Sequence, residues 1–259
     1  MLPDIKQFEK YNRTPPLTDW LRKINYPYYE EFNREDNTKF ERLQMLEKSI
    51  NLPYDVPESI EATEVMNNSK FFQDIMKKRA NERCAVRLTP HDVARTRIHA
   101  RGLTLKEYVD VWMPLQNINF DEYRLDIIPQ NTDMIYSAIF LINNYGIVGE
   151  ITKGIHWQLT QGMCEKDFVI FYFDFEKWLF SVTDEESRID PGQKILKRAL
   201  DMIIITDEEK KKNLKESLNA EFTEDGYLKG YFEFFVTPQK DILYNDYNRL
   251  IYQKLKDFR

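Results

Sequence analysis

Apolar residues recur along this chain at two different periods, and the change of period marks its predicted elements. Spacings of three and four residues predict helices over residues 37–49, 68–78 and 104–112, with Asp36 or Asn37 capping the first. Short apolar runs separated by turn residues predict strands over residues 84–88, 125–128, 135–143, 147–152 and 168–173. After them the pattern predicts a helical pair over 191–218, a hairpin over 230–249 and a closing helix over 247–258.

Strands that follow one another through short turns pair antiparallel, so the pattern predicts an α+β fold of mostly antiparallel sheets with flanking helices. Residues 1–35 are aromatic, charged and interrupted by proline, which is typical of an irregular arm or of short helices laid on a core. We therefore expect an N-terminal arm over 1–35 that is not a separate domain.

Composition excludes several classes of protein. The chain has 259 residues, of which 42% are hydrophobic, enough to build a packed core. Its net charge of -6 excludes a general nucleic-acid binder, which needs a basic surface. No apolar run approaches the length of a bilayer span and the start resembles no targeting peptide, so we expect a cytoplasmic protein without membrane contact. Cys84 and Cys164 lie far apart and are expected to be reduced thiols.

The predicted hairpin over residues 230–249 carries the strongest chemical signal. Alternation places Glu233 on one face of its first strand, and Asp246 and Asn248 on one face of its second. Two carboxylates and an amide are hard oxygen donors, which suit Mg²⁺ held against phosphate oxygens. The alternative is an ordinary amphipathic hairpin whose acids are solvated.

This hairpin resembles the closing hairpin of ATP-grasp enzymes. Their pattern is an acidic residue and Phe, a turn, and a hydrophobic strand that ends in Glu/Asp-x-Asn; the matching residues here are Glu233-Phe234 and Asp246-Tyr247-Asn248. The spacing is similar to that of the D-alanine ligase branch, although Asp stands where Glu is commoner. The resemblance implies that ATP and Mg²⁺ are cofactors, with Glu233, Asp246 and Asn248 holding the metal and Arg249 assisting catalysis or pairing with an acid.

The front half resembles the nucleotide-binding domain of pyruvate phosphate dikinase and phosphoenolpyruvate synthase. The matching segments are Asn37-Thr-Lys39, Leu43, residues 51–57 and Ala85-Val-Arg87-Leu-Thr89. The resemblance implies that Lys39 and Arg87 contact the ATP phosphates. The glycines of the family pattern are missing, which puts a close approach of backbone N–H groups to phosphate in doubt. The alternatives are a solvated Lys39 and an Arg87 in a structural ion pair.

The same resemblance implies a hinge that ends at Gln130 and a Gly-Glu pair at Gly149-Glu150. Gln130 would meet the adenine amino group or a ribose hydroxyl, and Glu150 would lie near the ribose or the metal. The alternatives are a turn residue for Gln130 and an exposed strand acid for Glu150.

Two further stretches stand out. Residues 149–162 are polar and punctuated by glycine inside an apolar region, so they are typical of a binding loop, with Lys153 on phosphate and His156 either a proton carrier or structural. Residues 95–101 alternate so that an extended strand would present Arg95, Arg97, His99 and Arg101 on one face. Such clustering in an acidic protein predicts an anionic partner; a salt-bridged surface is the alternative.

Together these resemblances imply an α+β, ATP-grasp-like enzyme in two lobes, a front ATP-grasp lobe over 36–120 and a sheet lobe over 121–259 that carries the metal-binding hairpin. It would transfer the γ-phosphoryl group of ATP to an acidic small molecule or to a separate phosphoacceptor protein, as a ligase or a phosphotransferase. Its catalytic residues would be Arg87, Lys153, His156 and Arg249. The alternatives are a catalytically inactive nucleotide-binding or interaction protein and an aromatic-rich binding module without nucleotide.

Overall fold

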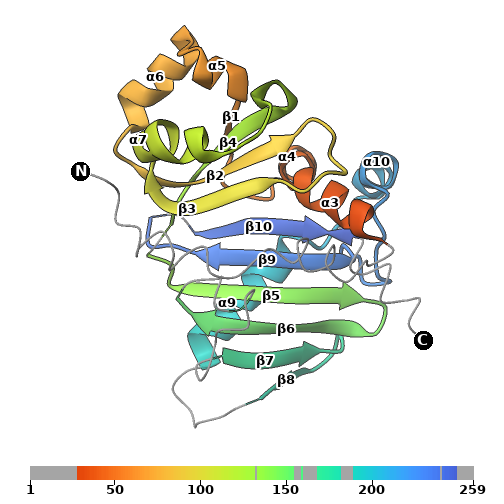
Figure 1. Ribbon diagram of the computed structural model, residues 1–259. Coiled ribbons are helices and arrows are strands. Elements are labelled where there is room, and N and C mark those ends of the chain that lie inside the picture. The colour runs from red at the N-terminus through yellow and green to blue at the C-terminus, as the bar shows by residue number, and fades with distance from the viewer. Residues whose placement is uncertain are drawn as a thin grey trace. The chain divides into compact units, whose positions relative to one another are not determined.

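The computed structural model describes residues 28–131, 133–154, 159, 168–181, 189–239 and 241–249. The chain forms two compact units, each built around one antiparallel sheet (Figure 1). Unit 1 comprises residues 1–38 and 56–130, and unit 2 comprises residues 39–55 and 131–259. The predicted α+β class with mostly antiparallel sheets is confirmed.

Unit 1 holds a four-stranded sheet in the order β1-β4-β2-β3. The strands are β1 (Glu58–Glu61), β2 (Arg83–Pro90), β3 (Ile98–Thr104) and β4 (Tyr123–Pro129). The helices are α3 (Tyr29–Asn37), α5 (Ala62–Met66), α6 (Lys70–Arg79) and α7 (Leu105–Glu107), and α7 continues into a π-helix over Tyr108–Trp112. Short 3-10 turns follow at Met113–Leu115 and Phe120–Glu122.

One face of this sheet is apolar and is covered by helices. Val86, Leu88 and Ala100 of the sheet pack with Phe72 of α6 and with Tyr108 in a single buried cluster. Because strand side chains alternate, the residues between them point to the opposite face, which is polar. The sequence of unit 1 therefore builds one hydrophobic layer and leaves a second, charged sheet face.

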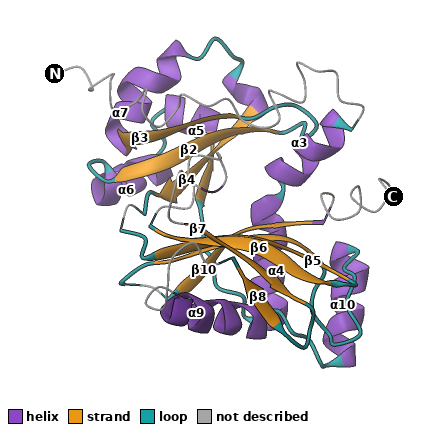
Figure 2. Ribbon diagram, turned by 90° about the horizontal axis from the view of Figure 1, so that it is seen from below, coloured by secondary structure: helices purple, strands orange, loops and turns teal. Residues whose placement is uncertain are grey.

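Unit 2 holds a six-stranded sheet in the order β10-β9-β5-β6-β7-β8. The strands are β5 (Tyr136–Asn143), β6 (Gly146–Lys153), β7 (Phe168–Phe173), β8 (Trp178–Phe180), β9 (Gly230–Val236) and β10 (Ile242–Asn248). The helices are α4 (Lys39–Ile50), α9 (Ile189–Asp201) and α10 (Glu208–Leu218). These helices cover one face of the sheet, as Figure 2 shows for α9 and α10.

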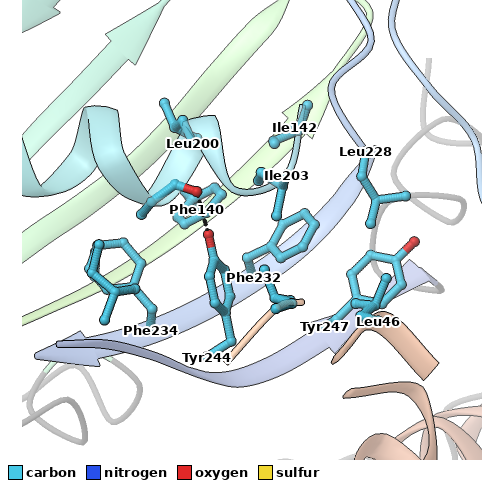
Figure 3. Close-up of a cluster of buried hydrophobic side chains, with 14 of the residues drawn as sticks. Leu46, Phe140, Ile142, Leu200, Ile203, Leu228, Phe232, Phe234, Tyr244 and Tyr247 are labelled. Atoms are coloured by element: carbon cyan, nitrogen blue, oxygen red, sulfur yellow. Dashed lines mark hydrogen bonds between the residues drawn. The ribbon is translucent and has the colours of Figure 1, made fainter. Parts of the chain in front are cut away.

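The core of unit 2 is aromatic. Phe140 and Phe232 stack with ring centroids 5.2 Å apart, and Phe232 lies 4.9 Å from Tyr247 (Figure 3). Tyr244 of β10 donates its hydroxyl to the carbonyl of Ala199 on α9 at 2.6 Å, the dashed line in Figure 3, which joins the helix layer to the sheet. This layer fixes which face of β9 and β10 is turned away from the core.

Two predicted elements lie near the ends of the described chain. Residues 1–35 were predicted to be an irregular arm or short helices, and the described part of this segment is helical, because α3 spans Tyr29–Asn37. Its buried residues are Asn33 and Asn37, so it has no apolar stripe that the pattern could reveal. β10 runs to Asn248, so the closing helix does not begin at residue 247; residues 250–258 lie outside the described part of the chain.

Candidate functional site

The face of the six-stranded sheet opposite the core carries a row of acidic side chains. Glu233 of β9 lies directly opposite Asp246 of β10 and, on its other side, opposite Ile139 of β5. Ile139 in turn lies opposite Glu150 of β6. Residues directly opposite each other in an antiparallel sheet share a face, so Asp246, Glu233 and Glu150 point to the same side.

The neighbouring row supplies an amide. Asn248 lies opposite Tyr231, two residues from Asp246 and Glu233 respectively, so it shares their face. Asn248 is buried and the side chain of Asp246 is 14% exposed. The register thus brings together the three predicted metal ligands, and with them Glu150, which was predicted to lie near the ribose or the metal.

A bulge in β10 shapes this group. The register shifts between Tyr244 and Asp246, so Asn245 is the extra residue of the strand. Its Nδ2 donates to Oε2 of Glu233 at 2.8 Å, and the Tyr231 hydroxyl donates to Oε1 of Glu233 at 2.8 Å. Both carboxylate oxygens are thereby oriented. Burial, and after it the charge of Glu233, raises the pKa of Tyr231 well above its usual value, so the hydroxyl keeps its proton.

Arg42 of α4 supports the same strand from the helix layer. Its Nε donates to the carbonyl of Tyr247 at 2.8 Å, and its Nη2 lies 3.9 Å from Oδ1 of Asp246. Sequence reasoning missed this residue. Lys39, Arg42, Leu43 and Leu46 fall on one helical stripe and all four are buried, so the pattern could have indicated that Arg42 is buried, but not which residue it contacts.

The donor set fits Mg²⁺. Within the described ranges there is no cluster of three or more His, Cys, Asp or Glu residues at metal-binding distance. Mg²⁺ needs fewer protein ligands than that, because it is usually held by one or two carboxylates together with substrate phosphates and water. Glu233, Asp246 and Asn248 offer two carboxylates and one amide on a single face.

The other predicted residues of unit 2 differ in their relation to this acidic row. β6 pairs with β5 without a register shift, so Lys153, three residues after Glu150, points to the opposite face of the sheet. Lys153 therefore does not join the acidic row. Lys39 is buried at the start of α4, 5.3 Å from the ring centroid of Phe40, so it is not solvated. Arg249 directly follows Asn248, and His156 lies outside the described residues.

The predicted cationic face of unit 1 needs a partial correction. β3 begins at Ile98, so residues 95–97 are not strand. They are held as a loop because the side-chain amides of Asn33 and Asn37 donate to the carbonyls of Ala94 and Arg95 at 2.8 and 2.7 Å. Arg95 pairs with Glu122, as the alternative of a salt-bridged surface predicted for it. Arg95 therefore does not belong to the cationic cluster.

The rest of the cationic cluster lies together on the polar face of this sheet. His99 is directly opposite Arg87, and Arg97 pairs with Asp36. Burial, followed by the charges of Arg97, Arg101 and Arg87, lowers the pKa of His99 to about 3, so this histidine is neutral at pH 7. Burial and the charge of Arg97 likewise lower the pKa of Arg87 to about 9.

Gln130 directly follows β4 in unit 1. Its Oε1 accepts from the Gly102 N–H at 2.8 Å, and its Nε2 is buried without a hydrogen-bond partner. The part of this amide without a partner is therefore a donor. Of the two groups that the sequence analysis named, a donor suits the ribose hydroxyl better than the adenine amino group, and it also suits a phosphate oxygen.

Comparisons with known proteins give no family model and no curated protein that matches the chain. Several solved structures are similar to it in part. They include the macrocyclase MdnC bound with precursor peptide MdnA from Microcystis aeruginosa MRC, at 14% identity and a TM-score of 0.36 over 82% of this chain and 53% of that one. The D-alanine-D-alanine ligase from Coxiella burnetii matches at 11% identity and a TM-score of 0.38, over 82% and 48%.

D-alanyl-alanine synthetase A from Vibrio cholerae O1 biovar eltor matches at 8% identity and a TM-score of 0.37, over 80% of this chain and 52% of that one. The chain thus spans about half the length of these three structures. Within the described residues, no helix is long and apolar enough to cross a membrane.

Proposed function

We propose that unit 2 binds ATP with Mg²⁺ at the acidic row, and that the chain is an ATP-dependent enzyme of ATP-grasp type that passes the γ-phosphoryl group to an acidic acceptor. The observation that carries this proposal is the alignment of Glu233, Asp246 and Asn248 on the sheet face opposite the core, where the register holds them across two strands. Surface acids of an ordinary hairpin need no such bracing.

The residues of this site would have two different roles, metal binding and support of the metal ligands. Glu233 and Asp246 would hold the metal, which supplies charge neutralisation to the phosphates when bound. Tyr231 and Asn245 fix the orientation of the Glu233 carboxylate, and Arg42 fixes the end of β10 that carries Asp246 and Asn248. Catalysis of phosphoryl transfer comes mainly from positioning and charge stabilisation, so rigid ligands on a sheet suit it.

The experiment is calorimetric titration of the chain with a non-hydrolysable ATP analogue, with Mg²⁺ and with EDTA. We expect binding that depends on Mg²⁺ and falls at least about tenfold in the Glu233→Gln/Asp246→Asn double variant, because each lost charged contact is worth about 1.5 kcal/mol or more. The matched control is Asp241→Asn, an exposed acid of the same hairpin that pairs with Arg198. Unchanged affinity in a folded double variant would exclude the metal assignment.

Turnover separates the enzyme from the inactive binder. A ligase would make an acyl phosphate from a carboxylate substrate, which hydroxylamine traps, whereas a phosphotransferase would label a protein acceptor from γ-³²P-ATP. Metal-dependent binding without either product favours the nucleotide-binding protein that has lost turnover. The missing glycines of the front half favour that alternative, and the braced metal ligands of β9 and β10 oppose it.

A further inference from the structure

The polar face of the sheet in unit 1 gathers cations around a small residue. Ala85 of β2 lies directly opposite Arg101 of β3, and on its other side opposite Ile128 of β4. Arg83 and Arg87 stand two residues before and after Ala85 on the same strand, so they share its face. Three guanidinium groups thus border a position that carries only a methyl group.

A β-bulge positions a fourth hydrogen-bond donor beside Ala85, the side-chain amide of Gln130. The register of β2 and β3 shifts so that Cys84 faces Leu103 and Ala85 faces Arg101, which leaves Gly102 as the extra residue, with φ at +94°. The N–H of Gly102 donates to Oε1 of Gln130. That bond fixes the amide with its Nε2 as a donor, and Nε2 is buried without a partner. Gln130 continues the alternation of Ile128 on β4, which places it on the Ala85 side of the sheet.

Two carboxylates near this face are already engaged. Asp36 pairs with Arg97. Asp126 lies opposite Arg87 and is 1% exposed; its Oδ1 accepts from Ser59 of β1 and its Oδ2 from Thr89 of β2, each at 2.6 Å, while Arg124 lies 3.3 Å away. Asp126 is thus bonded to the strands on both sides of β4. The Ala85 position lies one row away, beside Arg101, and is partly exposed.

We propose that this face, over Ala85 and between Arg101, Arg83 and the Gln130 amide, is a binding site for a phosphate group, separate from the metal site and independent of Mg²⁺. Arginine is the residue best suited to oxyanions because its planar fork donates two parallel hydrogen bonds. The neutral His99 adds a ring beside the cations without adding a charge. Phosphate is preferred to a carboxylate because three donor groups around one short side chain match the several acceptor oxygens of a tetrahedral dianion.

The test uses inorganic phosphate with the whole chain in EDTA, followed by calorimetry and thermal denaturation, against sodium chloride at equal ionic strength. We expect saturable binding that weakens about tenfold or more in Arg101→Gln, because a charge-assisted bidentate contact is lost. Gln130→Met removes one neutral donor and should weaken binding about threefold to tenfold. Arg95→Gln, which removes an exposed arginine paired with Glu122, should bind phosphate like the parent chain.

No binding beyond the chloride control, or equal binding by the parent chain, Arg101→Gln and Gln130→Met, would overturn the site. If Arg101→Gln fails to fold, the Gln130→Met variant decides alone, since that substitution removes no charge. The Glu233→Gln/Asp246→Asn variant should keep its phosphate binding, which separates failure of this site from failure of the ATP proposal.

Two sources of the phosphate group are told apart by competition. If the site takes the polyphosphate of the nucleotide, metal-free ATP displaces inorganic phosphate, and Arg101→Gln weakens both. If it takes phosphate from a second substrate or a product, inorganic phosphate and the Mg²⁺-loaded ATP analogue bind together. Either result supports the site and identifies its occupant.

Discussion

Glu233 and Asp246 lie directly opposite each other across β9 and β10, one residue past the bulge at Asn245. Two like charges in opposite positions of a sheet destabilise it by about 0.2–1 kcal/mol. Tyr231 and Asn245 nevertheless hold Glu233 in place beside Asp246. The cation that we propose for this face would offset the repulsion between the two carboxylates.

Glu233→Gln tests this directly. Without metal, we expect the free energy of unfolding of the variant to exceed that of the parent chain by about 0.5 kcal/mol, because the repulsion from Asp246 is relieved. Addition of Mg²⁺ with the ATP analogue at a hundredfold excess over its Kd should stabilise the parent chain by about 2.7 kcal/mol and the variant far less. Urea unfolding measures both. A metal-free variant that loses more than about 1 kcal/mol would instead mark Glu233 as a structural residue.

Arg42→Met examines the support of β10. The change removes a buried hydrogen bond to the Tyr247 carbonyl and the cation beside Asp246, so we expect a loss of about 2–4 kcal/mol in the free energy of urea unfolding. Arg198→Met is the matched control. It removes an arginine of the same unit whose ion pair with Asp241 is more than half exposed on both sides, and it should cost less than about 1 kcal/mol. Equal losses would mean that Arg42 contributes no more than a surface ion pair.

The sequence predicted the strands of the large sheet better than it predicted the site. β5, β6, β7 and the β9–β10 hairpin are apolar runs bounded by turns, and each lies where the pattern placed it. The faces of Glu233 and Asp246 follow from alternation alone. That they lie opposite each other depends on the bulge at Asn245, which alternation does not reveal.

Arg42 and the loop over residues 95–97 were missed for a different reason. Arg42 comes from a helix some 200 residues before Asp246 in sequence, and no local pattern reports such a long-range contact. Arg95 alternates with Arg97 and Arg101 as a strand residue would, yet Asn37 of α3 binds the carbonyls of Val93 and Arg95 and holds the segment out of the sheet. Tertiary hydrogen bonds override local periodicity at both places.

Gly149 and Gly192 predict opposite outcomes for the same substitution. A Cβ on Gly149 would lie 2.3 Å from the carbonyl oxygen of Ile139 and 2.7 Å from the Phe171 ring, so Gly149→Ala should destabilise unit 2 by about 3 kcal/mol or more. A Cβ on Gly192, inside α9, would meet nothing closer than 3.5 Å. Gly192→Ala should stabilise the chain by about 0.5–1 kcal/mol because alanine favours helix. Thermal denaturation of the two variants measures both effects. A change in melting temperature of the same sign for both variants would contradict the packing around β6.

His99 predicts how stability changes with pH. Burial first, then Arg97 and Arg101 of the same segment, Arg87 of β2 and, in the opposite sense, Asp36 of α3 set its environment and lower its pKa to about 3, against about 6.5 in the unfolded chain. Between these values the unfolded chain binds the proton and the folded chain does not. Its contribution to stability is therefore complete above pH 6.5 and is lost as pH falls towards 3.

The measurement is the free energy of urea unfolding at pH 7.0, 5.5 and 4.5, for the parent chain and for His99→Gln. Between pH 7 and pH 4.5, protonation of His99 in the unfolded chain should by itself lower the free energy of unfolding of the parent chain by about 2–3 kcal/mol. Each pH unit below 6.5 contributes about 1.4 kcal/mol. His99→Gln should lose less over the same range because glutamine does not titrate. If His99→Gln and the parent chain lose stability in parallel, His99 is already charged in the folded chain and the cations of unit 1 do not surround it.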